Sequence, residues 1–121
     1  MLRGTEKQIK YAEDILLEVN NILDELEKAV GRFSKNEERA AKAYAKHKEM
    51  KEYVNGYTVA GDVINDFKEV LKDKKQSART YTVIDILKEK GIRMTVAVSH
   101  KLANEQADKE QEEEFRKYGI S

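Results

Sequence analysis

Cysteine, proline and tryptophan do not occur in this sequence of 121 residues, and glycine occurs only six times. Without cysteine the chain has no disulfide framework and no thiolate metal cluster, which fits a reducing cytoplasm. No stretch approaches the roughly 18 consecutive apolar residues that a bilayer span needs, and the N-terminus lacks the apolar core of a secretion signal. We therefore expect a cytoplasmic protein with no membrane partner.

Neither sign of charge is in excess. The 23 basic side chains balance 23 acidic ones in a chain that is 38% charged. Balanced charge removes the long-range attraction that draws basic proteins to nucleic acid, so nucleic acid is an unlikely partner and anion binding requires a local patch. At this length a single domain, residues 1–121, buries a core without disulfides or metals.

A long antiparallel helical hairpin is predicted for residues 5–55. Thr5 begins a capping box, and the apolar residues after it follow an unbroken heptad repeat. Gly31 is expected to end this helix in a left-handed C-cap, and Ser34 to begin the second helix in another capping box. Because only three residues join the two helices, they must fold back on each other.

The first helix carries more apolar surface than one partner helix covers. Ile15, Ile22 and Ala29 form a second row beside the heptad positions. The widened face leads us to expect that another copy of the chain covers the remainder, giving a homo-oligomer through the first helix. Binding sites would then lie at a subunit boundary.

Residues 56–121 are predicted to form a smaller α+β part. Asp62 is expected to cap a short helix, whereas the segment from Thr80 to Leu87 fits either a helix or a strand, because β-branched residues dominate it. Alternating apolar residues between Ile92 and Val98 predict a strand, and Ser99 is expected to cap a terminal helix. The predicted fold class is α+β, predominantly helical.

The usual catalytic and metal-binding patterns do not occur in the sequence. His47 and His100 are the only histidines, and neither has a histidine or carboxylate at the helical spacing that metal ligands need, so His47 is interpreted as a histidine within the helical core. Ser99 neighbours His100 in sequence only, which does not bring the two side chains together. The glycines stand singly, so no phosphate-binding loop is formed. We expect no enzyme, no cofactor and no metal.

Five residues form a candidate ligand-binding set. Planar cations and rings able to stack on a base occur where the helical pattern weakens, at Arg79, Tyr81, Arg93, His100 and Arg116. This combination suits a small nucleotide-like anion. The alternative interpretation is that the arginines decorate the surface and Tyr81 belongs to the core.

Two blocks resemble a known group of sequences. The opening from Gly4 to Ile15, GTEKQIKYAEDI, resembles GSEKQIKWAEDI, which recurs in small proteins of bacterial and phage genomes. The block from Ser77 to Asp85 is similar to a second segment of that group, SAKWWID, with two residues inserted and both tryptophans missing. Together they cover about a fifth of the chain. The resemblance implies a phage or mobile-element protein and indicates no chemistry.

The size, the neutral composition rich in lysine and glutamate, and the lack of a catalytic set resemble the Thoeris anti-defence sponge family. Members of that family are small oligomers that sequester cyclic ADP-ribose-type signals without cleaving them. No motif of the family aligns with this chain, so no site residue is carried over. The resemblance implies a phage protein that acts in the cytoplasm of the host bacterial cell.

The leading hypothesis is therefore a non-enzymatic phage anti-defence protein. It would bind and sequester a cyclic nucleotide-type immune signal, a cyclic ADP-ribose isomer, at a subunit interface. One alternative is a protein-interaction inhibitor such as an anti-CRISPR, using the acidic run near Glu113 to imitate nucleic acid. Another is a helix-turn-helix DNA binder formed by residues 62–71 and 77–90.

Overall fold

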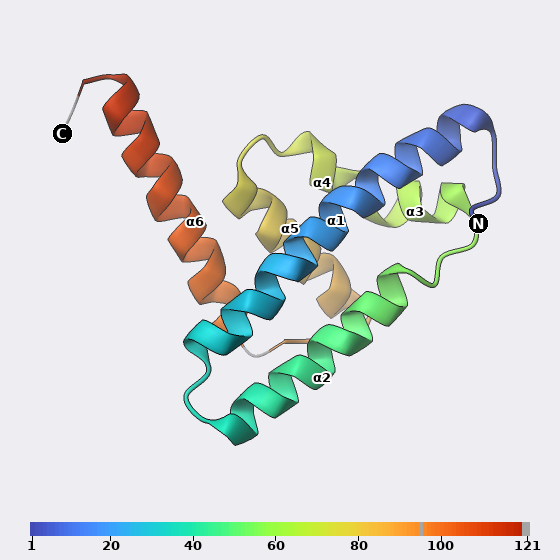
Figure 1. The fold of residues 1–121 in the computed structure, drawn as a ribbon. Helices are drawn as coiled ribbons and strands as arrows, with labels where there is room; N and C mark the ends of the chain where they lie inside the picture. Colours follow the sequence, from blue (N-terminus) through green and yellow to red (C-terminus); the bar gives the residue numbers. More distant parts are fainter. Residues whose placement is uncertain (95, 120–121) are drawn as a thin grey trace.

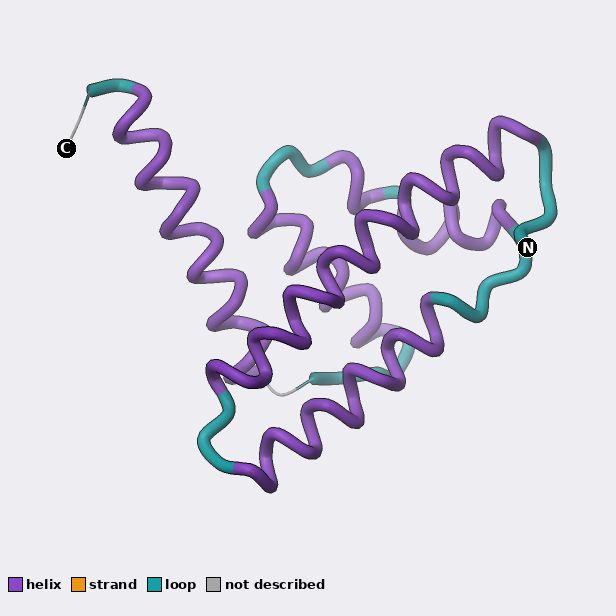
Figure 2. Tube along the Cα trace, in the orientation of Figure 1, coloured by secondary structure: helices purple, strands orange, loops and turns teal. Residues whose placement is uncertain are grey.

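The computed structural model describes residues 1–94 and 96–119, without the side chains of residues 96 and 97. Within these residues the chain forms helices joined by loops (Figures 1 and 2). The helices are α1 (Glu6–Phe33), α2 (Glu37–Val54), α3 (Ala60–Phe67), α4 (Glu69–Lys72), α5 (Gln76–Glu89) and α6 (Val96–Lys117). Buried residues from both halves of the sequence belong to one hydrophobic cluster.

The α+β prediction is wrong, because the described residues form no strand. Their only β-type pairing is an isolated bridge between Arg3 and Val59. Of the strand expected from Ile92 to Val98, residues 92–94 form a connector, residue 95 lies outside the described residues, and α6 begins at Val96. Ile92 and Met94 are buried and Arg93 is exposed, so the alternation of apolar and polar residues is reflected in burial without a strand.

The open question about residues 80–87 is resolved as helix. Their threonines fit α5 because their hydroxyls bond to backbone carbonyls one turn earlier. The hydroxyl of Thr80 donates to the carbonyl of Gln76 at 3.0 Å, and that of Thr82 donates to the carbonyl of Ala78 at 3.0 Å. These local bonds, together with burial of the apolar residues of α5, outweigh the β-branched composition.

One face of α1 is fully buried within a single chain. Helix α1 contacts α2 through α6, and Figure 1 shows it crossing the middle of the molecule with α2 antiparallel beside it. The residues with no exposed surface include the second apolar row, and they are Ala12, Ile15, Val19, Ile22, Leu23, Leu26, Ala29 and Val30. The expectation that a second copy must cover this face is therefore wrong, and self-association loses its physical basis.

The helix ends differ from the sequence expectation at four places, of which the last is the start of α6. The capping box at Thr5 is confirmed, with the Thr5 hydroxyl accepting from the Gln8 amide at 3.2 Å. Gly31, however, does not end α1, which continues to Phe33. Ser34 caps nothing with its hydroxyl, and Asn36 begins α2 by accepting from the Arg39 amide at 2.8 Å.

The third difference is the start of α3, which precedes the expected cap at Asp62. The helix begins at Ala60, and the Ala60 amide donates to the carbonyl of Arg3 at 2.8 Å. Arg3 in turn donates its amide to the carbonyl of Thr58 at 2.8 Å. The N-terminal segment therefore satisfies backbone groups that a side-chain cap would otherwise satisfy. The N-terminus is thereby tied to the α2–α3 connection.

Polar contacts from Gln106 and Glu110 attach α6 to the start of α5. The Ser77 hydroxyl donates to the Glu110 carboxylate at 2.7 Å, and the hydroxyl oxygen of Thr80 lies within hydrogen-bond distance, 2.7 Å, of the side-chain amide of Gln106. From residue 111 to residue 119 every residue is exposed. Ser99 lies inside α6, three residues after its start, so the expectation that it caps the last helix is wrong.

The position of Gly31 gives the first testable prediction. Because Gly31 is helical, Gly31→Ala is expected to raise the free energy of unfolding by about 0.5 kcal/mol. The added Cβ would lie 3.3 Å from the hydroxyl of Tyr44, a half-exposed side chain that is able to move. Gly91, with φ +87°, is the matched control, and Gly91→Ala should lower stability by about 1 kcal/mol. Urea denaturation measures both, and destabilisation by Gly31→Ala would contradict the helical end of α1.

Candidate functional site

The structure brings three of the five predicted ligand-binding residues together. The rings of Tyr81 on α5 and His100 on α6 meet edge to face, with centroids 5.6 Å apart. Arg93, from the connector between these helices, lines the same cavity as His100. A stacking ring, an imidazole and a guanidinium therefore lie at the junction of α5 and α6.

A cavity of about 130 Å³, partly open to solvent, lies at this junction. It is lined by residues from the end of α5, the connector and the start of α6, namely Ile84, Asp85, Lys88, Arg93, Met94, Ser99 and His100. Two basic side chains, Lys88 and Arg93, line the cavity together with one carboxylate, Asp85. The buried side chains of Ile84 and Met94 give the cavity an apolar floor beneath these charges.

The turn after α5 creates the cavity. Gly91 adopts φ +87°, and the amide of Ile92 then donates to the carbonyl of Leu87 at 2.9 Å. This glycine-based ending reverses the chain so that the connector crosses the end of α5. Ile92 and Met94 are buried in the core, which turns the side chain of Arg93 outward.

Sequence reasoning missed Lys88 and Asp85. On a helix, Tyr81, Asp85 and Lys88 follow one another at spacings of four and three residues and so share a face. The signal was present in the sequence, but it could be recognised only after residues 77–90 had been assigned as helix. A strand would have placed Lys88 on the face opposite Tyr81 and Asp85.

The side chain of Arg79 is bonded to groups outside the α5–α6 cavity. Its Nε donates to the backbone carbonyl of Asp73 at 2.6 Å, and a terminal nitrogen lies 3.5 Å from the carboxylate of Glu18 on α1. These contacts hold the break between α4 and α5 against α1. Arg79 therefore forms a structural ion pair and does not line the α5–α6 cavity.

Arg116 is remote from the cavity. It lies 16 residues after His100 on α6, which corresponds to about 24 Å along the helix. Its guanidinium lies 3.0 Å from the carboxylate of Glu112 and is largely exposed. Arg116 therefore behaves as a surface residue.

The surface that a helix-turn-helix protein would present to DNA is covered here. Ser77 and Thr80, near the start of α5, are buried against Glu110 and Gln106 of α6. A recognition helix needs these early residues to reach base edges. The position of α6 therefore argues against DNA binding by α5.

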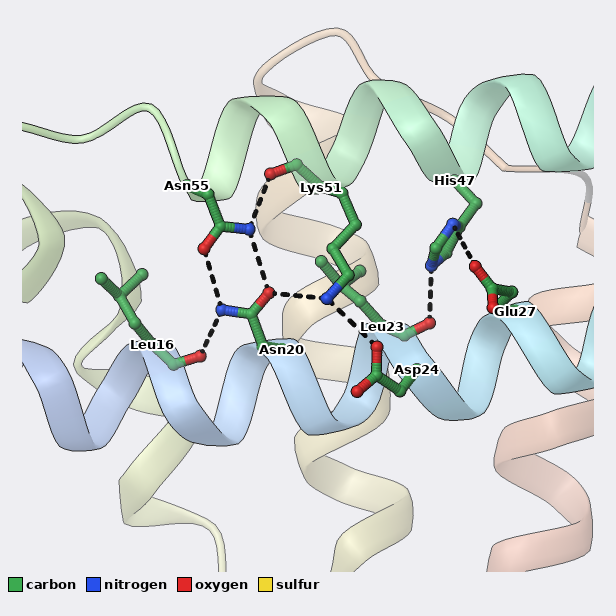
Figure 3. A network of polar contacts seen from close by, with 8 residues as sticks. All are labelled: Leu16, Asn20, Leu23, Asp24, Glu27, His47, Lys51 and Asn55. Carbon is green, nitrogen blue, oxygen red and sulfur yellow. Dashed lines mark hydrogen bonds and ion pairs between the residues drawn. The ribbon is translucent and has the colours of Figure 1, made fainter.

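A cluster of polar side chains lies between α1 and α2 (Figure 3). The side-chain amides of Asn20 and Asn55 donate a hydrogen bond to each other, at 3.2 Å and 3.1 Å. The ammonium group of Lys51 lies 3.2 Å from the side-chain oxygen of Asn20 and 3.1 Å from the carboxylate of Asp24. Each of these groups has a partner inside the cluster. We interpret the cluster as a device that fixes the register of the hairpin.

His47 belongs to the same cluster. The imidazole is 4% exposed, and its Nε2 lies 2.9 Å from the carbonyl of Leu23. Because a carbonyl only accepts, Nε2 carries a hydrogen. Nδ1 lies 3.4 Å from the carboxylate of Glu27 at the edge of the hairpin. This is the core histidine that the sequence suggested.

Comparisons with known proteins identify no relative. No family model, no curated protein and no solved structure matches this chain. Within residues 1–94 and 96–119 no helix combines the length and the apolar character that crossing a bilayer requires. In the same residues no three side chains of histidine, cysteine, aspartate or glutamate are grouped as metal ligands.

The amide pair between Asn20 and Asn55 gives a second prediction. Asn20→Ala should lower the free energy of unfolding by about 1 kcal/mol, because it removes bonds to Asn55, Lys51 and the Leu16 carbonyl. In a double-mutant cycle with Asn55→Ala we expect a coupling of about 0.5 kcal/mol. Urea denaturation of the three variants measures it. Strictly additive effects would show that the amide pair does not stabilise the hairpin.

Proposed function

We propose that this protein is a non-enzymatic binder of a small nucleotide-type anion and that it holds the anion in the α5–α6 cavity. The observation that carries the proposal is that Arg93, Lys88 and His100 line one cavity. Guanidinium and ammonium groups form charge-assisted hydrogen bonds with phosphate oxygens. Asp85 is available to accept a hydrogen bond from a ribose hydroxyl.

The size of the cavity decides which part of a ligand it holds. Complete pockets for drug-sized molecules measure roughly 300 to 1,000 Å³. A space of about 130 Å³ suits a phosphate or ribose phosphate group. The rest of a nucleotide would then lie outside the cavity, where the half-buried ring of Tyr81 offers a stacking surface.

The biological role that we propose is sequestration of an immune signal of the cyclic ADP-ribose type by a phage anti-defence protein. This part rests on the resemblance to sponge proteins. Cations and a stacking ring recognise such a molecule, and recognition without cleavage is sufficient for a sponge. Self-association through α1 is no longer part of the proposal, because the apolar face of α1 is already buried.

The third prediction concerns Arg93. Arg93→Ala should weaken binding of ADP-ribose or of its cyclic isomers about tenfold, the loss expected for one charge-assisted contact of about 1.4 kcal/mol. Isothermal titration calorimetry measures the affinity. Heating the wild-type complex should then release the ligand unchanged, as judged by chromatography.

Arg116→Ala is the matched control, because it removes an arginine from the same part of the chain without touching the cavity. It should bind like the wild type. Equal affinity of the Arg93 and Arg116 variants would reject the cavity as the site. Recovery of a cleaved ligand would reject sequestration in favour of an enzyme.

A second candidate function is inhibition of a basic protein by the end of α6. Residues 111–119 are all exposed, and they combine the acidic run at Glu112, Glu113 and Glu114 with exposed rings of Phe115 and Tyr118. Negative charges along a helix resemble the phosphates that a nuclease binds. The rings add apolar contact area to this charge.

The fourth prediction tests this surface against a basic CRISPR nuclease. Binding should weaken at least tenfold between 50 and 300 mM salt, because exposed charges are screened over about 8 Å at physiological ionic strength. Reversing the charge with Glu113→Lys and Glu114→Lys should abolish it, whereas the exposed Glu13→Lys on α1 serves as control. Fluorescence anisotropy measures the affinity. An affinity that changes neither with salt concentration nor with charge reversal would eliminate this candidate function.

A further inference from the structure

The end of α2 is followed by a solvent-open hollow of about 320 Å³ that none of the preceding functions uses. Its lining comes from the last turn of α2 and the residues after it, namely Glu52, Tyr53, Gly56 and Tyr57. A Cβ on Gly56 would lie 3.1 Å from the carbonyl oxygen of Glu52. A larger residue at this position would therefore crowd the backbone of the last turn of α2.

Two tyrosine rings form a right-angled corner in this hollow. Tyr53 and Tyr57 have ring centroids 5.6 Å apart and an interplanar angle of 88°. The Tyr57 ring also meets Phe67 edge to face at 5.9 Å, and its hydroxyl donates to the Asp66 carboxylate at 2.6 Å. The aromatic wall is thus held in place from α3.

Glu52 is the carboxylate that lines the hollow, because the other nearby carboxylate, Asp66, is bonded to Tyr57 and Lys90. Lys90 lies 3.4 Å from Asp66 and balances that carboxylate behind Tyr57. Burial, and then the hydrogen bond to Asp66, raise the pKa of the Tyr57 hydroxyl, so this wall stays neutral. Glu52 is exposed and forms no ion pair within the described part of the chain.

Electron-rich ring faces beside an unpaired carboxylate attract a cation. A spherical methylated ammonium is best held by a cage of several rings, whereas this corner has two rings and one carboxylate. A guanidinium is planar, stacks on a tyrosine face and pairs with a carboxylate through its edge. The geometry of the hollow therefore favours a guanidinium over an ammonium group.

We propose that the hollow formed by Glu52, Tyr53 and Tyr57 binds a guanidinium group, stacked on a tyrosine ring and paired with the Glu52 carboxylate. The group could come from a free small molecule or from an arginine side chain of a peptide, and the chemistry of recognition is the same. This site is separate from the α5–α6 cavity. Its ligand carries the opposite charge.

The fifth prediction uses NMR of protein labelled in its tyrosine rings. Methylguanidinium should shift the resonances of Tyr53 and Tyr57 and should bind about fivefold more tightly than tetramethylammonium. An acetylated and amidated Gly-Arg-Gly peptide distinguishes the two sources, since tighter binding of the peptide indicates a side-chain ligand and equal binding a free one. Glu52→Gln should weaken methylguanidinium about fivefold, and Tyr53→Leu about tenfold.

The controls are Glu13→Gln and Tyr44→Leu, an exposed acid on α1 and a half-exposed tyrosine on α2, and both should bind as the wild type does. Circular dichroism checks that Tyr53→Leu is folded, and Glu52→Gln tests the site on an exposed residue that the fold does not need. Equal shifts of all six tyrosines, equal affinity for tetramethylammonium, or unchanged binding by Glu52→Gln would overturn the proposal.

Discussion

Burial of one face of α1 is the constraint on which this structure depends. The helix is 28 residues long, about 42 Å, and its inward residues have no exposed surface. No single partner covers such a face, since α2 has only 18 residues and a narrow row of small and medium side chains. The shorter helices α3 to α6 complete the cover, and removal of apolar surface from water is the dominant favourable contribution to folding.

Polar contacts then determine how the covering helices are placed. The Asn20–Asn55 pair sets the register of α2 on α1, and the ion pair of Arg79 with Glu18 attaches the start of α5 to α1. Glu110 attaches α6 to the start of α5. Such contacts add little net stability, but a buried or half-buried polar group has few positions in which it is satisfied. They therefore select one arrangement among several that would bury the same apolar face.

Local patterns in the sequence predicted the first half of the fold because its signals are local. The heptad repeat and the capping box at Thr5 act within one helix, so they were sufficient for the α1–α2 hairpin. The connector from Ile92 to Met94 was misassigned because alternating burial is shared by strands and by extended segments that cross a core. Only the absence of a partner strand distinguishes them, and pairing is a property of the whole fold.

The candidate site, like the fold, was only partly predictable from the sequence. The meeting of Tyr81, Arg93 and His100 depends on a reversal at Gly91 that brings α6 back over the end of α5. Arg79 looked equivalent in sequence, yet its guanidinium is occupied by the Asp73 carbonyl and by Glu18 from a helix sixty residues earlier. The sequence shows which side chains carry a charge. It does not show which of these charges are paired with a partner in the folded protein.

The α5–α6 cavity and the hollow after α2 have similar positions in the fold. Each lies where a helix ends at a glycine, Gly56 after α2 and Gly91 after α5, and where the chain turns before it packs again. Lys88 in the last turn of α5 lines the α5–α6 cavity, whereas Lys90, the residue after α5, lies 3.4 Å from Asp66 behind the tyrosine corner. The α5–α6 cavity therefore has more basic than acidic side chains, whereas Glu52 is the charged side chain that lines the hollow after α2. The two sites that we propose would bind ligands of opposite charge, although the chain as a whole is neutral.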